Sequence, residues 1–237
     1  MILLYIESDF MNKKYIVLIG IVVFIIVILT ICIPQKENNE VLLGIDYNVK
    51  GNLSSLKYDT DNPVVAMHVE NYGSIVMELY PDIAPNTVNN FISLVKSGFY
   101  DNNTFHRLDD DFVLQGGDPT GTGGGGPGYT IYGEFSSNGF ENSLSHEKWV
   151  VSMAREDSNF NSAGSQFFIC LEDSLFLDGD YAAFGKIIDG FSVIEKIEEE
   201  EETIGDKTGT LKRNLIIEKT LIDLHNKEYE NVIKTVN

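Results

Sequence analysis

Short β-rich runs separated by turn residues fill the chain between residues 62 and 224. The first two runs, at residues 64–70 and 74–80, are joined by Asn-Tyr-Gly, which is typical of a tight hairpin. Further runs of the same kind lie at residues 149–154, 166–171, 182–188 and 215–224. Because a sheet of many short strands must protect its edges, this pattern predicts a closed antiparallel sheet.

Two segments have the pattern expected of helices. Pro85 stands where the first turn of a helix accepts it, apolar residues follow at helical spacing from Val88 to Val95, and Gly98 ends the segment. A second helix is expected from Phe191 to about Glu199. The residues alone therefore predict a mainly β domain with two helices.

Residues 15–33 form an uncharged, almost wholly apolar stretch. As a helix it would be roughly 28 Å long, about the thickness of a bilayer's hydrocarbon core. Lys13 and Lys14 precede it, so the positive-inside tendency predicts a cytoplasmic segment at residues 1–14, a single membrane span, and a domain outside the cell membrane. A cleaved signal peptide and a lipoprotein signal at Cys32 are the alternatives, and Met11 is a second candidate start.

The remaining segments are polar. Residues 34–61 predict a spacer between membrane and domain, and residues 225–237 predict a loosely held C-terminal tail. The two cysteines, Cys32 and Cys170, do not make a disulfide framework. A net charge of -19 without a basic stripe argues against a nucleic-acid partner, which requires clustered Lys and Arg.

Three separated segments combine an arginine, two glutamines and several aromatic residues. They are residues 105–107 (Phe-His-Arg), 112–118 (Phe-Val-Leu-Gln-Gly-Gly-Asp) and 164–170 (Gly-Ser-Gln-Phe-Phe-Ile-Cys). Such side chains suit an apolar proline ring and the peptide groups beside it. Their order and spacing resemble the cyclophilin family of peptidyl-prolyl cis-trans isomerases over residues 62–224. The resemblance implies an eight-stranded antiparallel barrel capped by two helices.

The resemblance also implies catalytic roles for Arg107 and Gln115. Rotation about a prolyl amide is slow because resonance sets a barrier of roughly 18–20 kcal/mol. Arg107 matches the family's catalytic arginine, whose rigid, always-charged donors suit the twisted amide. A surface salt bridge with the aspartates at residues 109–111 is the alternative use of this arginine. Gln115 matches the polar position near the arginine, and Gln166 matches one that faces the substrate backbone.

The substrate-binding positions follow from the same resemblance. Phe112, Phe168 and Leu177 match the apolar proline pocket, and Val113 stands at its rim where methionine is common in the family. Ala154 and Arg155 match the strand that bonds the peptide, although Arg155 replaces an asparagine.

Two further positions depart from the family pattern. Phe176 stands where many members carry tryptophan, and Tyr181 where many carry histidine. The missing indole N–H removes one donor, so we expect weak binding of cyclosporin.

The other motifs do not indicate a nucleotide or metal site. The glycine run at residues 121–126 fits a nucleotide-loop pattern, but no helix follows, so we expect a flexible loop beside the cleft. The four histidines lack ligand spacing, so no metal site is expected. The glutamates at residues 198–202 predict a solvated charge run.

The sequence therefore predicts a peptidyl-prolyl cis-trans isomerase that acts on proline-containing polypeptides and assists the folding of exported or envelope proteins. A monomeric domain without a cofactor is expected. The first alternative is a non-catalytic chaperone or scaffold module that holds proline-containing segments. The second is a structural envelope protein whose acidic surface binds divalent cations.

Overall fold

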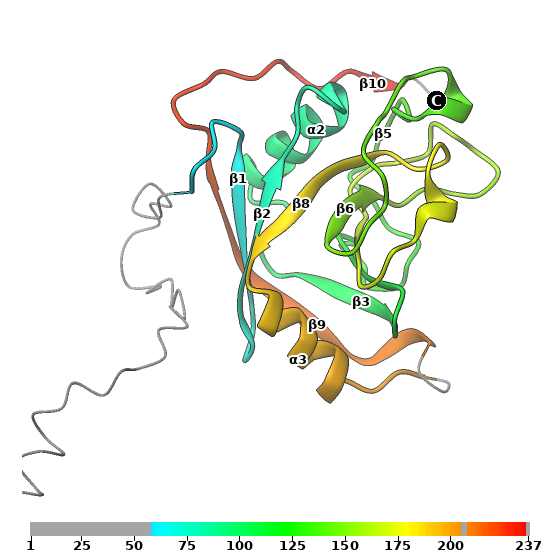
Figure 1. Ribbon diagram of the computed structural model, residues 1–237. Helices are drawn as coiled ribbons and strands as arrows, with labels where there is room; N and C mark the ends of the chain where they lie inside the picture. The colour runs from blue at the N-terminus through cyan, green and yellow to red at the C-terminus, as the bar shows by residue number, and fades with distance from the viewer. Residues whose placement is uncertain (1–57, 205–207, 236–237) are drawn as a thin grey trace, which may run out of the picture. The chain divides into compact units, whose positions relative to one another are not determined.

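The computed structural model describes residues 58–204 and 208–235, and eight of its strands close into a barrel (Figure 1). The order around the barrel is β1-β2-β8-β6-β7-β4-β3-β9, and every neighbouring pair is antiparallel. The strands are Val64–Val69 (β1), Gly73–Leu79 (β2), Asn103–Asp109 (β3), Val113–Gly116 (β4), Val150–Met153 (β6), Phe167–Cys170 (β7), Ala183–Asp189 (β8) and Thr208–Asp223 (β9). The expected eight-stranded antiparallel barrel is confirmed.

Two helices accompany the barrel, as predicted. They are α2 (Pro85–Lys96) and α3 (Phe191–Glu200), and Figure 1 shows them toward opposite ends of the sheet. Pro85 occupies the first turn of α2, where its missing N–H costs no hydrogen bond. The helix turns Phe91 into the barrel, where its ring centroid lies 5.0 Å from those of Tyr100 and Phe184. Helix α2 thereby supplies the centre of the aromatic core.

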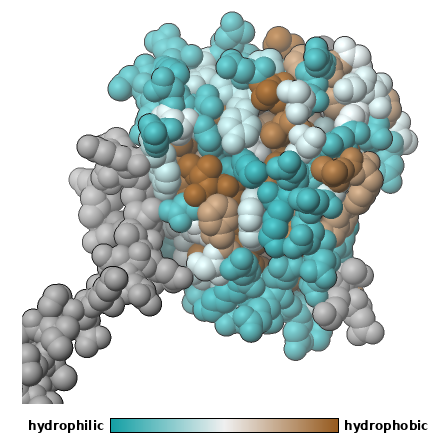
Figure 2. Space-filling model, in the orientation of Figure 1, coloured by the Kyte–Doolittle hydropathy of each residue, from teal (hydrophilic) through white to brown (hydrophobic). Residues whose placement is uncertain are grey.

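The outer face of α3 is hydrophilic, as Figure 2 shows at the bottom of the view. The apolar side of α3 buries Val193, Ile194 and Ile197. The glutamates that follow form individual ion pairs, such as the one between Glu202 and Lys212. Their arrangement is that of a solvated charge run, and within the described residues no group of three or more His, Cys, Asp or Glu side chains could hold a metal ion.

Strand β9 begins earlier than its apolar residues predict. Its first half pairs with β3 and its second half with β1. Only the second half belongs to the predicted run at residues 215–224. The first half contains the exposed residues Lys212 and Arg213 between the buried residues Leu211 and Leu215, and these charges obscure the strand pattern.

The folded domain begins earlier in the chain than the predicted boundary at residue 62. Residues 1–57, with the predicted cytoplasmic segment, the apolar stretch at residues 15–33 and most of the spacer, lie outside the described residues. Tyr58 packs beside the buried residues Val64 and Ala66, and the Thr60 hydroxyl donates to Glu78 Oε1. The end of the predicted spacer therefore belongs to the folded domain. Between residues 58 and 235, omitting 205–207, no helix is long and apolar enough to span a bilayer.

The expectation of a loosely held C-terminal tail is wrong for residues 225–235. Tyr229 and Val232 pack against the main core. Beyond them, β10 (Lys234–Thr235) pairs with β5 (Thr130–Ile131) in a small sheet of its own (Figure 1). The polar composition of this segment conceals the two apolar contacts that dock it.

Candidate active site

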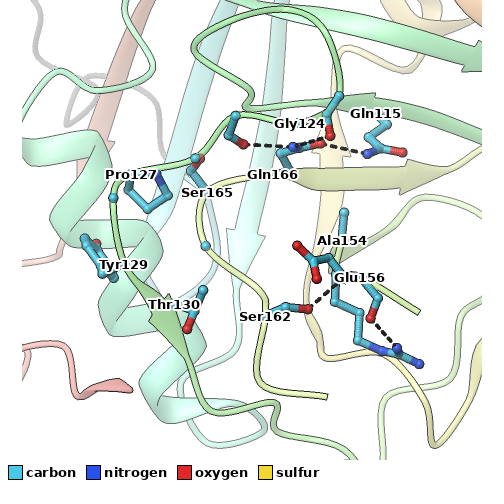
Figure 3. A pocket seen from close by; sticks show the side chains of 16 residues that line it. Gln115, Gly124, Pro127, Tyr129, Thr130, Ala154, Glu156, Ser162, Ser165 and Gln166 are labelled. Carbon is cyan, nitrogen blue, oxygen red and sulfur yellow. Dashed lines mark hydrogen bonds between the residues drawn. The ribbon is translucent and has the colours of Figure 1, made fainter. Parts of the chain in front are cut away.

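Three polar side chains form a continuous chain of hydrogen bonds across β3, β4 and the start of β7. Arg107 Nη1 donates to Gln115 Oε1 at 2.9 Å, and Gln115 Nε2 donates to Gln166 Oε1 at 3.0 Å. Gln166 Nε2 then donates to the carbonyl oxygens of Gly123 and Gly125, both at 2.9 Å (Figure 3). A guanidinium can only donate, so its contact with Gln115 orients both amide groups along the chain.

The Arg107 guanidinium is held on a second side by Asp109. Nη2 of Arg107 pairs with Oδ2 of the buried Asp109 carboxylate. The salt bridge considered as an alternative use of the arginine is thus present, and it coexists with the bond to Gln115. Since 38% of the Arg107 side chain stays exposed, its remaining N–H groups are accessible from solvent.

A cavity of about 470 Å³ opens beside Arg107, and we call it the first cavity. Its apolar part is a cluster separate from the main core, built from Val113, Phe168 and Leu177 with Phe112, Ala154 and Tyr181 packed against it. The structure brings nine of the eleven predicted site residues to its lining: Arg107, Phe112, Val113, Gln115, Ala154, Arg155, Phe168, Leu177 and Tyr181.

Phe176 is one of the two predicted residues outside this lining. It belongs to the 3₁₀ turn Leu175–Leu177, which directs Leu177 toward the cavity and leaves Phe176 73% exposed. The Phe176 ring stacks on Phe112, with 5.6 Å between ring centroids. Phe176 therefore extends the apolar surface at the rim of the first cavity.

Gln166, the other exception, lines a neighbouring cavity of about 470 Å³, which we call the second cavity (Figure 3). The two cavities share four lining residues: Gln115, Gly123, Ala154 and Arg155. The far wall of the second cavity is formed by residues 126–130, including Tyr129 and Thr130. Sequence reasoning missed this wall, although the glycine run that leads into it was placed beside the cleft.

The glycine run is held in place, contrary to the expectation of a flexible loop. The buried Asp118 carboxylate accepts hydrogen bonds from the backbone N–H groups of Thr120, Thr122 and Gly123 at 2.6–3.0 Å. Burial alone would raise the pKa of Asp118, but hydrogen bonds from Thr120, Gly125 and Gly123 outweigh it and hold this pKa well below its usual range. The carboxylate therefore stays ionised and fixes the loop that Gln166 contacts.

Gly117 allows the chain to enter this loop. Its φ is +88°, and a Cβ atom there would collide with the Ser165 carbonyl oxygen. Only glycine accepts both the left-handed backbone and the close approach of the segment before β7. Gly117 of the second motif is thus explained by packing next to the site.

His146 supports the floor of the first cavity and was also missed by sequence reasoning. Its ring stacks on Phe168, and its two nitrogens lie 2.7 Å from Asp178 Oδ1 and 3.0 Å from Ser152 Oγ. Burial lowers the pKa of His146, with Asp178 acting in the opposite direction. The trio has the composition of a nucleophilic triad, but Ser152 is 0% exposed and no substrate can reach its hydroxyl.

Arg155 is engaged with the protein itself. Its guanidinium lies over the Tyr181 ring at 4.6 Å, and its Nε donates to the Asp180 carbonyl at 2.8 Å. Nη1 donates to the carbonyl oxygens of Glu156 and Asp157. The side chain therefore joins the loop after β6 to the rim residue Tyr181.

His106 lies behind Arg107 and lines the first cavity. It is 4% exposed, and within residues 58–204 and 208–235 neither ring nitrogen has a hydrogen-bond partner. Burial lowers the pKa of His106, although Asp118 raises it. A neutral imidazole fits the predicted role of a structural neighbour better than that of an acid.

Comparisons with known proteins agree with this arrangement. Residues 64–221 match the family model described as cyclophilin type peptidyl-prolyl cis-trans isomerase/CLD. A peptidyl-prolyl cis-trans isomerase-like 1 protein of Rhizopus delemar is 47% identical over 126 residues, which cover 53% of this chain and 74% of that protein. A peptidyl-prolyl cis-trans isomerase of Helicobacter pylori is 44% identical over 131 residues, covering 54% of this chain and 77% of that protein.

A similar solved structure is the Cryptosporidium parvum cyclophilin type peptidyl-prolyl cis-trans isomerase in the presence of the dipeptide Ala-Pro. It has a TM-score of 0.59 and 35% identity, and the match covers 68% of this chain and 98% of that one.

Proposed function

Since the chain belongs to the cyclophilin-type peptidyl-prolyl cis-trans isomerase family, we propose that Arg107 and Gln115 accelerate rotation about a prolyl bond bound in the first cavity. The domain is a peptidyl-prolyl cis-trans isomerase. The observation that carries the assignment of residues is the Arg107 guanidinium, fixed between Asp109 and Gln115 beside the apolar part of the first cavity.

The reaction breaks no covalent bond, so the enzyme needs to bind the twisted amide better than the planar one. On twisting, the prolyl nitrogen becomes pyramidal and regains a lone pair that can accept a hydrogen bond. Arg107 has five N–H donors, of which the contacts with Gln115 and Asp109 use two. The others can bond the twisted amide, and each tenfold gain in rate requires about 1.4 kcal/mol of such preferential binding.

The apolar cluster supplies the anchor. Phe112, Phe168 and Leu177 offer surface for the proline ring, so that one side of the bond is held while the other turns. The related structure, which was determined in the presence of the dipeptide Ala-Pro, supports a short proline-containing peptide as the ligand of this cleft. Gln166, next to the shared residue Gln115, has its amide directed by the same hydrogen-bond chain and is proposed to contact the peptide backbone.

The test is cis-trans exchange of an Ala-Pro peptide, measured by NMR with the full chain. Arg107→Ala is expected to abolish the acceleration. Arg213→Ala is the matched control, because Arg213 pairs with Glu201 and does not line the first cavity. Peptide binding by the parent without acceleration would contradict the catalytic assignment and favour a binding module.

We also propose that the domain works outside the cell membrane, on exported or envelope proteins. The support is the apolar stretch at residues 15–33 preceded by Lys13 and Lys14. The mass of the membrane-extracted protein distinguishes three cases. The stretch can be retained as an anchor, cleaved off, or lipidated at Cys32, and each case predicts a different mass. Protease added to intact cells should digest the domain in the anchored and lipidated cases, and resistance would contradict the proposed location.

A further inference from the structure

We infer that residues 224–235 form a strap that positions the far wall of the second cavity and thereby sets the affinity for peptides longer than the proline dipeptide. The inference rests on the proposed function of the same cleft. The strap lies beyond residues 64–221, which match the family model, so it is a feature of this chain outside the matched domain.

The strap begins with a sharp turn after β9. His225 and Asn226 both have positive φ, 50° and 59°, and the His225 N–H donates to Asp223 Oδ1 at 2.8 Å. The chain then runs back across the end of the barrel that holds α2 (Figure 1). On the way, Tyr229 and Val232 pack against the core. The segment is therefore docked along its length rather than only at its end.

The strap is fastened to the first turn of α2. The Asn86 side chain accepts a hydrogen bond from Ile233 N at 2.7 Å and donates one to Ile233 O at 2.9 Å, so it binds both backbone polar groups of one residue. The same turn is held from the other side by Glu134, which accepts from Thr87 N at 2.7 Å. The start of α2 thus links the strap to the segment that follows β5.

The end of the strap contacts the wall of the second cavity directly. Lys234 pairs with Ile131 and Thr235 with Thr130, and the two threonine hydroxyl groups are hydrogen-bonded. The Lys234 ammonium lies 3.9 Å from the centroid of the Tyr129 ring. Tyr129 and Thr130 line the second cavity, where Figure 3 shows both on the wall that faces the glutamines.

Without the strap this wall loses the partner strand of β5, although Ile131 and Tyr129 still pack against the main core. Strand β5 has only two residues, and a strand pair of this size is marginal in isolation. Apart from the strap, Ile131 N donates to Ala163 O at 2.8 Å and the Tyr129 hydroxyl donates to Asn90 Oδ1 at 2.8 Å. Loss of the strap should therefore loosen residues 129–131 while leaving the first cavity unchanged.

The two cavities share lining residues, which makes the strap relevant to binding. A peptide whose proline occupies the first cavity passes Gln115 and Ala154 and brings a nearby residue to the second cavity. A dipeptide is too short to exploit the far wall, whereas a longer peptide contacts it. The strap should affect only the longer ligand.

Two strap variants of the full chain test this. One ends after Asp223, and the milder one combines Lys234→Ala with Thr235→Val. The matched control is Glu228→Gln, which changes an exposed side chain in the same segment. The dissociation constant and KM are measured for Ala-Pro and for two longer peptides. In one of these the Ala-Pro unit is extended by three residues on its N-terminal side, and in the other by three residues on its C-terminal side. Both variants are expected to lower the affinity for whichever extended peptide binds the parent more tightly by about three- to tenfold, the effect of losing one or two hydrogen bonds. The affinity for Ala-Pro should change less than about twofold.

Hydrogen exchange provides the structural readout. Amides of residues 129–131 should exchange faster in both variants, and those of β3 and β4 should keep the rates of the Glu228→Gln control. Equal weakening of both peptides, or unchanged affinity for the extended ones, would overturn the inference. If the parent failed to accelerate Ala-Pro exchange, the proposed function would fail, but the binding comparison would still decide the role of the strap.

Discussion

Arg107 on β3 and Gln115 on β4 are direct partners in the barrel register, and Arg107 Nη1 donates to Gln115 Oε1 at 2.9 Å. Their spacing is set by the sheet and not by a loop. The amide of Gln115 is also tied to Gln166, which in turn reaches the glycine run. The groups proposed for catalysis are thus held before substrate arrives, which is the condition for strong electrostatic stabilisation of a transition state.

Replacing Arg107 by lysine should remove most of the catalysis. A lysine keeps the charge, but its single ammonium cannot reproduce the rigid fork that meets Asp109 and Gln115 together. We expect kcat/KM to fall about 100-fold, as when one donor of a preorganised site is lost, with little change in peptide affinity. NMR exchange and titration measure the two quantities. Parent-like exchange in Arg107→Lys would show that charge alone suffices.

Replacing Gln115 by glutamate should break the hydrogen-bond chain at its centre. A carboxylate still accepts from Arg107 but has no donor for Gln166 Oε1. If the Gln166 amide turns to compensate, it gives up its bonds to the glycine carbonyls. We expect kcat/KM to fall about tenfold, the scale of one lost bond to a charged or buried group. Amides of residues 123–125 should exchange faster, and unaltered exchange there would argue against the relay.

Replacing Asp118 by asparagine should destabilise the domain at neutral pH. The carboxylate accepts several N–H groups of the glycine run, and hydrogen bonds to charged groups contribute about 1.5–3 kcal/mol each. Urea unfolding of both proteins measures the difference in free energy.

The pH dependence of that difference is a separate prediction. The pKa of Asp118 is lowered on folding, so its contribution is fully present above the unfolded-state pKa, about 3.9, and is lost as pH falls below it. The difference in free energy of unfolding between the parent and Asp118→Asn should therefore become smaller as pH falls from about 5 to 2. The exposed Asp61→Asn serves as control. A free-energy difference that stayed constant over this range would contradict the role of the ionised Asp118 carboxylate.

Replacing Phe176 by tryptophan should tighten cyclosporin binding. Phe176 is exposed at the rim and stacks on Phe112, so a larger ring can be added there without disturbing the core. The indole supplies the N–H donor that phenylalanine lacks. We expect the parent to bind weakly and the variant about tenfold more tightly, consistent with one added hydrogen bond. Calorimetry measures both affinities, and nanomolar binding by the parent would contradict the expectation.

Much of the barrel can be predicted from local patterns. The hairpin of β1 and β2 has β-rich apolar runs on either side of Asn-Tyr-Gly, and α2 carries its own start signal in Pro85. Strand β5, strand β10 and the first half of β9 cannot be predicted in this way. They are short or charged, and partners distant in sequence stabilise them, as Thr130 on β5 and Thr235 on β10 do across 105 positions.

The candidate site, like the fold, is only partly predictable from the sequence. The motifs contain the residues that face the first cavity, and nine of the eleven predicted residues meet there. The support that His146 gives remains hidden in the sequence, because it acts through contacts with Asp178 and Phe168 that only folding creates. Phe176 shows the limit of position matching, since its match to a family position does not reveal how far it turns outward.

The pairing of β1 with β9 has a consequence for how the protein is made. The two strands that close the barrel are its first and its last, so the ring of backbone hydrogen bonds stays open until nearly the whole domain has left the ribosome. Such long-range closure is slow compared with local contacts and leaves sheet edges exposed in the meantime. An enzyme that relieves slow steps in other chains must therefore complete a late, non-local step in its own biogenesis.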